Sequence, residues 1–217
     1  MFLFAFSYLS LRVLSQISLP DANIKLTFKE GVTAKEIIII LKEKGFNIDE
    51  NKFLSQEGYL FPDTYKFHPA AGSDQILKQM LDNFFAQAGN VDYQDLIMAS
   101  IIQKEESSAE EMPKIAGVFY NRLAKNIRLQ ADSTVNYVTG KSMPQALITD
   151  TKIADPYNTY QIYGLPPAPI SNPGLDAIGA AQNPKNHNYL YFLHAQSGKA
   201  IYAQTFSEHK QNKEKHL

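Results

Sequence analysis

The order of local signals in the N-terminal third constrains the fold of this chain more than any other feature of its sequence. Residues Ile24–Phe28 alternate in polarity and include β-formers, which predicts a strand. Thr33 and Glu36 have the spacing of a capping box, in which a hydroxyl and a carboxylate satisfy free backbone groups at a helix start. The pattern therefore predicts a helix through Ile37–Lys44 that stops at Gly45, a residue type common just after helix ends.

A second helix and a second strand complete this module. Asp49–Leu54 predicts a short helix, and Glu57–Phe67 predicts a turn followed by a strand. The β-α-α-β order over so short a stretch predicts a small module at residues 20–68. Residues 1–19, ahead of it, begin with the apolar run Met1–Leu11, which is shorter than the about 20 apolar residues that cross a bilayer. This run fits a signal-peptide core or truncated anchor, or the remnant of a longer N-terminal module.

Helical spacing dominates the middle of the chain. An apolar stripe over Ser73–Gln87 predicts a helix whose stripe faces a core rather than a ligand. The stripe consists of Ile76, Leu77, Met80, Leu81, Phe84 and Phe85. Asp92 can cap a helix over Tyr93–Glu106. A further capping box at Ser108–Glu111 predicts a helix to about residue 125, with a first turn that starts a few residues later because of a proline.

Loop-forming residues dominate the last third of the chain. We expect two short helices and then a strand pair there, over Thr134–Thr139, Leu175–Ala181, Tyr189–Leu193 and Ala200–Gln204. The polar tail after His209 is expected to fray. These elements predict an α+β fold, in which the small module is followed by a mixed helical and short-strand domain over residues 69–217.

Composition narrows the function classes. The chain has 217 residues and a formal net charge of −1, so nothing suggests a nucleic-acid partner. The absence of cysteine excludes disulfides, thiolate metal sites and thiol nucleophiles. The five histidines show no metal-ligand spacing, and we expect neither a catalytic metal nor a cofactor. A neutral polysaccharide or a small molecule fits as the ligand.

Glu105 is the first candidate for chemistry. On a helix it extends an apolar stripe that contains Ile97, Ile101 and Ile102, whereas Glu106 is turned away from the stripe centre. Partial desolvation and the nearby helix C-terminus both disfavour a charged carboxylate, and a general acid at neutral pH needs such a raised proton affinity. Taken alone, the pattern favours an edge carboxylate that reaches water, because such carboxylates are common.

Polar loops that follow this helix favour a functional Glu105 over a simple edge carboxylate. Amide and hydroxyl side chains gather in Asn121–Leu123, Arg128–Tyr137 and Tyr157–Tyr160, and a proline-dense loop covers Gly164–Ile170. A stiff loop can present backbone groups to a ligand at a small ordering cost, and tyrosines and amides suit a sugar. Each polar residue taken singly is also explained by turn chemistry or capping.

Several stretches together resemble the YceG-like, or MltG-type, endolytic murein transglycosylases. They are EGYLFPDTY at Glu57–Tyr65, ASIIQKE at Ala99–Glu105, VFYNRL at Val118–Leu123, LQADST at Leu129–Thr134, NTY at Asn158–Tyr160, GLPP at Gly164–Pro167, Pro173–Gly174 and YLYF at Tyr189–Phe192. They follow the order of the family across about residues 24–210, and such a series is far more specific than any single motif.

The resemblance implies a peptidoglycan lytic transglycosylase that needs no cofactor, with Glu105 as its catalytic acid/base. Such a lyase cleaves the MurNAc–GlcNAc bond of nascent strands, leaves 1,6-anhydro-MurNAc ends and terminates strand elongation. Residues 20–68 look like the wall-binding LysM-like module of the family, and residues 69–217 look like its catalytic domain. Our candidates for substrate positioning are Asn121, Gln130, Asp132, Thr134, Asn158 and Tyr160.

The resemblance also implies a place in the cell. The family is anchored in the cytoplasmic membrane of bacteria, and its catalytic part faces the wall. Peptidoglycan strands would be the substrate, and cell-wall synthesis proteins are the expected protein partners. The anchor looks short or missing in this sequence.

Three positions depart from the pattern of the family. Many relatives have an acidic residue in place of Gln103 and a threonine in place of Glu106, and proline is usual where this chain has Ser133. A carboxylate at Glu106 could compete with Glu105 for the acid role, and Ser133 is expected to loosen its loop.

Two other functions stay open. A hydrolytic muramidase would pair Glu105 with a second carboxylate, for which Asp132 is the best available candidate. A non-catalytic glycan-binding module would result if Glu106 or the Ser133 loop spoiled the site.

Overall fold

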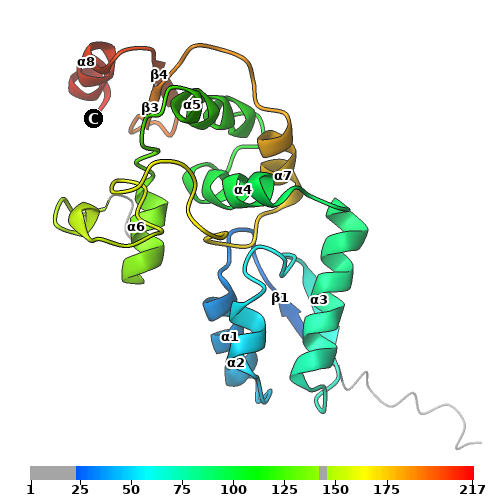
Figure 1. Cartoon of the computed structure of the whole chain (residues 1–217). Coiled ribbons are helices and arrows are strands. Elements are labelled where there is room, and N and C mark those ends of the chain that lie inside the picture. The colour runs from blue at the N-terminus through cyan, green and yellow to red at the C-terminus, as the bar shows by residue number, and fades with distance from the viewer. Residues whose placement is uncertain (1–22, 142–145) are drawn as a thin grey trace, which may run out of the picture.

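The structure is a computed structural model that describes residues 23–141 and 146–217, so the predicted apolar segment 1–19 lies outside the described residues. Within these residues a run of helices separates two small antiparallel sheets, and the predicted α+β class is confirmed. Figure 1 shows the N-terminal elements at one end of an elongated molecule and the C-terminal helix at the other. Within the two described stretches, no helix combines the length and the apolarity that a membrane crossing requires.

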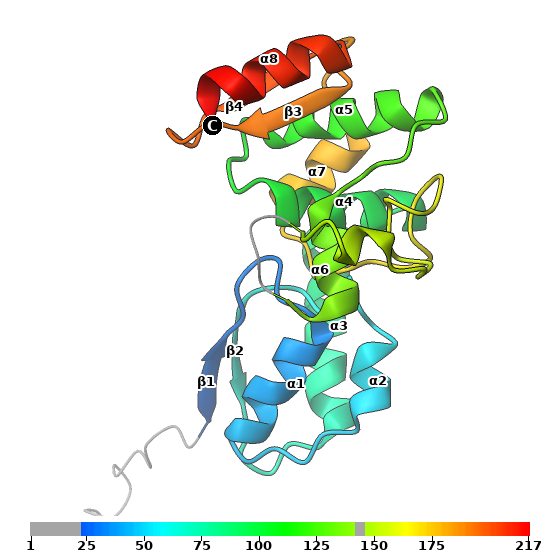
Figure 2. The same cartoon turned by 90° about the vertical axis from the view of Figure 1, so that its left-hand side faces the viewer.

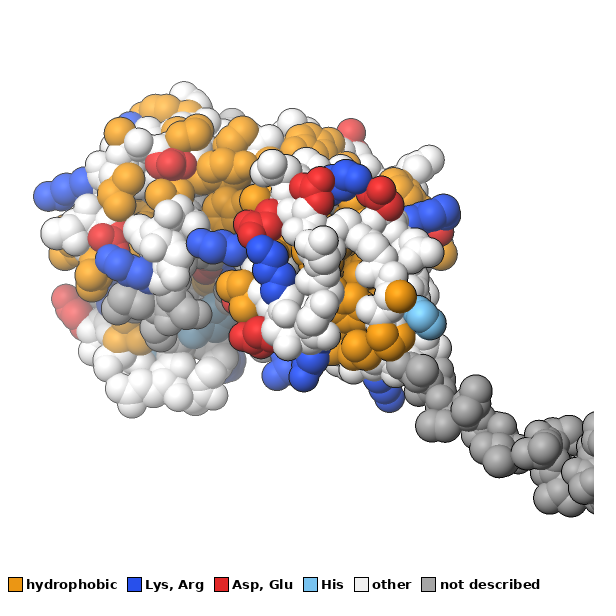
Figure 3. Space-filling model, turned by 90° about the horizontal axis from the view of Figure 1, so that it is seen from below, with side chains coloured by type: hydrophobic (Ala, Val, Ile, Leu, Met, Phe, Trp, Pro, Cys, Tyr) orange, Lys and Arg blue, Asp and Glu red, His pale blue; other side chains and the backbone are white. Residues whose placement is uncertain are grey.

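The N-terminal unit has the predicted β-α-α-β order. Strand β1 (Ile24–Thr27) pairs antiparallel with β2 (Thr64–Phe67), and helices α1 (Ala34–Glu43) and α2 (Glu50–Leu54) connect them. Figure 2 shows α1 lying beside the strand pair, with α2 on its other side. Figure 3 shows acidic and basic side chains interspersed at this end of the molecule, where Lys42 pairs with Glu50.

Helix α1 begins at the predicted capping box. The Thr33 hydroxyl accepts a hydrogen bond from the Glu36 backbone N–H at 3.2 Å, and the Glu36 carboxylate accepts one from the Thr33 N–H at 2.8 Å. Both bonds satisfy donors that a helix start leaves free. The helix then buries Ile37 and Leu41 in a core that also contains Phe67 of β2.

Helix α3 (Ser73–Ala88) belongs to two hydrophobic cores. Its first half contributes Ile76 and Met80 to the core of the N-terminal unit, and its second half contributes Phe84 to the core of the following helices. The predicted apolar stripe is therefore a core face at Ile76, Met80 and Phe84, whereas its last member, Phe85, is 51% exposed. The helix that opens the predicted catalytic domain thus packs partly on the N-terminal unit, and the boundary at residue 68 stays a prediction.

Helix α4 (Tyr93–Glu105) forms the centre of the second core. Seven successive residues, 96–102, are buried, so every side of the helix is covered. Helices α5 (Met112–Ala124) and α7 (Leu175–Gln182) pack around it, as Figure 1 shows. The Asp92 carboxylate caps its start, as predicted, by accepting from the Gln94 N–H at 2.8 Å. A fully enclosed helix is a rigid support for the side chain of its last residue, Glu105.

Short elements complete the domain. Helix α6 (Asp132–Thr139) lies beside α4, and a 3-10 helix, η1 (Asp150–Lys152), packs against α6. Strands β3 (Tyr191–His194) and β4 (Ala200–Ala203) form the predicted hairpin, which packs against α5.

Two expectations about helix ends are wrong. The residues at 108–111 make no capping box: α5 begins at Met112, and the Glu111 carboxylate instead accepts hydrogen bonds from the Lys114 ammonium and the Tyr202 hydroxyl. The tail does not fray, because helix α8 (Phe206–His216) continues through it. A capping box at Thr205 starts this helix.

Candidate active site

Glu105 is the last residue of α4, and its carboxyl lines a cleft of about 510 Å³. One oxygen, Oε1, accepts two hydrogen bonds from Ser133: one from the hydroxyl at 2.6 Å and one from the backbone N–H at 3.3 Å. Ser133 is the second residue of α6, so this helix points its N-terminus at the carboxyl. The end of one helix and the start of another therefore fix the position of Glu105.

The surroundings raise the pKa of Glu105, in the direction that the helix pattern predicted. Burial is the largest cause, because removal from water penalises the charged carboxylate. The two Ser133 hydrogen bonds act in the opposite direction, as does a charge on His194, while the Asp132 carboxylate adds to the rise. Glu105 thus has an environment suited to a general acid near neutral pH.

The cleft walls come from elements far apart in the sequence. Helix α5, residues 129–132, Tyr160, strand β3 and helix α8 all contribute. Aromatic side chains in these walls are Phe119, Tyr160, Tyr191, Phe192 and Phe206. Aromatic faces beside polar groups suit a sugar, which has apolar ring faces and many hydroxyl groups.

Three of the six predicted positioning residues line this cleft: Gln130, Asp132 and Tyr160. The Tyr160 hydroxyl donates to the Asp132 carboxylate at 2.7 Å. Burial and this hydrogen bond raise the pKa of Tyr160, so its hydroxyl keeps its proton at neutral pH. Gln130 adopts a left-handed backbone (φ 52°), and its side-chain oxygen accepts from the Arg122 guanidinium at 2.6 Å. Its amide N–H₂ group makes no hydrogen bond to residues 23–141 or 146–217.

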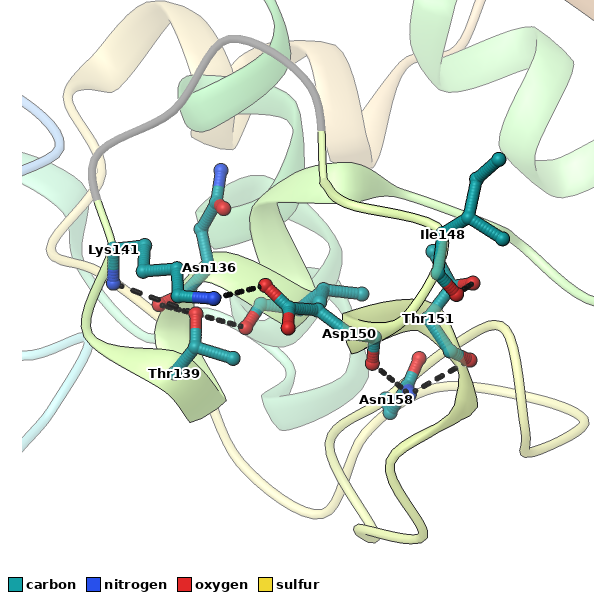
Figure 4. A network of polar contacts seen from close by, with 8 residues as sticks. Asn136, Thr139, Lys141, Ile148, Asp150, Thr151 and Asn158 are labelled. Carbon is teal, nitrogen blue, oxygen red and sulfur yellow. Dashed lines mark hydrogen bonds and ion pairs between the residues drawn. The ribbon is translucent and has the colours of Figure 1, made fainter.

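The other three predicted residues are used inside the protein. Asn158 is fully buried, and its amide donates to the carbonyls of Thr151 at 3.2 Å and Ile153 at 2.8 Å. Figure 4 shows this amide below η1, next to the ion pair of Lys141 with Asp150. Asn158 therefore shapes the loop that leads to Tyr160.

Thr134 and Asn121 likewise bond to protein groups. Thr134 is fully buried; its hydroxyl donates to the Ala131 carbonyl at 2.7 Å and lies 2.9 Å from the Thr159 hydroxyl. The Asn121 amide donates to the carbonyls of His187 at 2.7 Å and Tyr189 at 3.0 Å. These contacts place both residues behind the cleft wall.

Arg122 is a structural residue of the site that our candidate set left out. It is buried, and its guanidinium donates to the carbonyls of Arg128 at 2.9 Å and Leu190 at 3.1 Å. It also lies 5.3 Å from the Tyr191 ring centre, a cation–π contact. It joins α5 to the Gln130 loop and to β3. Its place beside Asn121 in the VFYNRL motif was the available sequence signal.

Glu106 does not project into solvent, although the helix pattern turns it away from the apolar stripe. Its carboxylate accepts from the N–H groups of Ser107 and Ser108, both at 2.7 Å, and lies 3.0 Å from His194 Nε2. Only 9% of its side chain is exposed. Glu106 thus holds His194 in the cleft wall while Glu105 faces the cleft, and no sequence signal marked His194.

Ser133 also differs from expectation. Instead of loosening its loop, it is buried and directly hydrogen-bonded to Glu105. The two residues are 28 positions apart, so no local pattern could have paired them.

This chain is similar to known proteins. The model of the YceG-like family matches residues 7–215. The endolytic murein transglycosylase of Bacillus subtilis (strain 168) is 40% identical over 172 residues, which are 74% of this chain and 48% of that protein. The endolytic murein transglycosylase of Streptococcus pneumoniae (serotype 2, strain D39) is 29% identical over 94% of this chain and 43% of its own length. The chain thus spans less than half the length of each.

A solved structure is similar as well. The crystal structure titled as a putative yceG-like protein from Listeria monocytogenes superposes with a TM-score of 0.72 at 31% sequence identity. The match covers 86% of this chain and 75% of the other. The shared fold extends over both the N-terminal unit and the helical domain.

Proposed function

Because this chain belongs to the YceG-like family, we propose that it is an endolytic lytic transglycosylase that cleaves peptidoglycan at the bacterial cell envelope. The observation that carries the proposal is a carboxyl with a raised pKa, Glu105, in a cleft lined by aromatic side chains and the Gln130 amide. The curated names of two relatives that cover 74% and 94% of the chain support the same reaction.

In the proposed reaction, Glu105 first acts as an acid. Its carboxyl proton passes to the glycosidic oxygen between MurNAc and GlcNAc, the C1–O bond breaks, and GlcNAc leaves as an alcohol. Positive charge then develops at C1 of the muramyl sugar. The carboxylate of Glu105, formed by the loss of its proton, faces that charge.

Glu105 then acts as a base. It takes the proton of the muramyl C6 hydroxyl while that oxygen attacks C1, and the product is a 1,6-anhydro-MurNAc end. The attack is intramolecular, which removes the entropy cost of bringing in a second reactant. Glu105 regains its proton, so the cycle closes without consuming water.

The remaining cleft residues would orient the glycan. Gln130 and the pair of Tyr160 with Asp132 offer donors and acceptors to sugar hydroxyls. Asp132 is held by Tyr160, which suits an orienting role better than that of the second carboxylate in a muramidase. Cutting within nascent strands would terminate their elongation.

We propose that residues 20–68 act as a LysM-like glycan-binding module and residues 69–217 as the catalytic domain. We also propose membrane association through an N-terminal anchor, with the catalytic domain facing the wall, and contact with cell-wall synthesis proteins.

The decisive experiment is digestion of purified peptidoglycan in ¹⁸O-labelled water, followed by mass spectrometry of the fragments. Anhydro-ended muropeptides without the label are expected. Label at the new muramyl end would instead identify a hydrolase. Binding of peptidoglycan without any product would identify a non-catalytic module.

A further inference from the structure

The two oxygens of the Glu105 carboxyl have different surroundings. Oε1 accepts both Ser133 hydrogen bonds, at 2.6 Å and 3.3 Å. Oε2 receives no hydrogen bond from residues 23–141 or 146–217. Both donors come from one residue and converge on one oxygen, so the carboxyl cannot exchange its two oxygens without breaking both bonds.

We propose that Ser133 is a positioning residue that assigns separate roles to these oxygens: Oε1 is kept as an acceptor, and Oε2 carries the proton that Glu105 gives and takes back. The inference deepens the proposed function and depends on it for the identity of the reaction.

The chemistry of a neutral carboxyl supports this division. A protonated carboxyl has one carbonyl-type oxygen, which accepts hydrogen bonds well, and one hydroxyl oxygen, which donates. Two donors on Oε1 therefore favour the form with the proton on Oε2. After proton transfer, the same two donors stabilise the negative charge on Oε1, and such bonds to an ionised acceptor are stronger than neutral ones.

The position of Ser133 makes both donors available. Its N–H lies in the first turn of α6, where a helix leaves N–H groups without internal partners. The helix start is held from behind, because the Ala131 N–H donates to the Thr159 hydroxyl at 3.0 Å and the Thr134 hydroxyl donates to the Ala131 carbonyl. Thr134, predicted to bind substrate, thus supports the residue that holds the acid.

Charged and titratable groups from each neighbouring element act on the same carboxyl. Asp132 of α6 raises the pKa of Glu105, and His194 of β3, when charged, lowers it; Tyr160 also lies close enough to interact electrostatically. Burial holds the proton on Glu105 and the Ser133 hydrogen bonds favour its release. Ser133 therefore works against a carboxyl that would otherwise be too weak an acid.

The test compares Ser133→Ala, which lacks the hydroxyl donor, with Ser133→Thr, which keeps it. A hydrogen bond to a charged group contributes about 1.5–3 kcal/mol, so kcat should fall roughly 10- to 100-fold in the alanine variant. The basic limb of its pH profile should move to higher pH, because a bond that favours the carboxylate is lost. The threonine variant should restore both kcat and the position of the basic limb. The control is Ser197→Ala, in the exposed turn of the hairpin, which should match the wild type.

A second readout does not depend on cleavage. The Glu105 carboxyl can be titrated by ¹³C NMR in the ligand-free protein, with the signal assigned by its loss in Glu105→Gln. Ser133→Ala should titrate at higher pH than the wild type, and Ser133→Cys, a weaker donor of similar size, should lie between them. An unchanged titration overturns the inference, as does an activity loss that threonine does not rescue. The NMR titration still tests the Ser133–Glu105 hydrogen bonds even if the wild type yields no anhydro ends.

Discussion

Glu105 and Glu106 are adjacent in sequence, but their carboxyls meet different partners. Glu105 ends α4 and faces the cleft, where Ser133 holds one of its oxygens. Glu106 turns to the backbone of the next two residues and to His194. Glu106 follows the last residue of α4 and has an extended backbone (φ −144°, ψ 140°), so its side chain leaves in a different direction from that of Glu105.

This separation predicts different outcomes for matched substitutions. Glu105→Gln keeps the shape and removes the proton, so turnover should fall by roughly 10²–10⁴-fold, the contribution of a general acid/base. Glu106→Gln keeps an oxygen for the N–H groups of Ser107 and Ser108 and changes only the contact with His194, away from the reacting carboxyl. It should therefore retain most of its activity. Initial rates of muropeptide release measure both, and equal losses would undo the assignment of Glu105.

The cleft-facing and buried hydroxyls should also respond differently. Tyr160→Phe removes the donor to Asp132 at the cleft, and we expect kcat/KM to fall about tenfold, equivalent to about 1.4 kcal/mol, with little change in stability. Thr134→Ala leaves the Thr159 backbone N–H without its partner inside the protein and should lower the free energy of unfolding by about 1–3 kcal/mol. Urea unfolding and turnover of each variant separate the two roles; a large stability loss in Tyr160→Phe would contradict this division.

At the scale of elements, α8 forms one wall of the cleft without belonging to either core. None of its residues is fully buried, yet Phe206, His209 and Lys213 line the same cleft as Glu105. The His209 ring stacks on Tyr191 of β3 at 5.2 Å, which seats the helix on the hairpin. The helix therefore shapes the cleft while contributing little to the stability of the domain.

Removal of α8 should test that role. A chain that ends at Gln204 should keep its thermal unfolding temperature within a few degrees, because a loss of 1 kcal/mol shifts it by about 2–4 °C in a domain of this size. Its kcat/KM should fall at least about tenfold, through the loss of one wall. Lys215→Ala, on the same helix but outside the cleft, is the matched control. Unchanged turnover in a folded truncation would show that α8 has no part in the site.

At the scale of the whole molecule, a buried polar cluster joins the N-terminal unit to the helical domain. The Glu57 carboxyl accepts from the Ala34 N–H at 2.9 Å and from the Asn172 amide at 2.9 Å. The Asn172 side-chain oxygen accepts from the N–H groups of Gly58 and Leu60. Burial raises the pKa of Glu57 from 4.5 to about 7. A single asparagine after the proline-dense loop thus connects both units.

This raised pKa predicts a pH-dependent stability. The folded state binds the Glu57 proton more tightly than the unfolded state, so its contribution is complete below pH 4.5 and is lost as pH rises to about 7. At 1.36 kcal/mol per unit, the loss is at most about 3 kcal/mol. Urea unfolding at pH 5 and pH 8 should show this drop in the wild type and not in Glu57→Gln. The same drop in both proteins would assign it to other groups.

The sequence by itself determined the features that depend on neighbouring residues. The capping box at Thr33, the apolar stripe of α3 and the cap at Asp92 follow from spacing along the chain, and the structure has all three. The α+β class follows from the order of these elements. The ordered motifs established the family, and the stripe around Glu105 indicated a carboxyl with raised proton affinity.

Only the tertiary structure decided which polar loop residues face the cleft. Gln130, Asp132 and Tyr160 reach it, while Asn121, Thr134 and Asn158 bond to the protein behind it, because loop residues have no periodicity that reveals their direction. The long-range contacts were hidden because their partners lie far apart in the sequence. Ser133 meets Glu105, His194 meets Glu106 and α8 covers the cleft only because the packing of α4, α6 and the hairpin brings distant segments together.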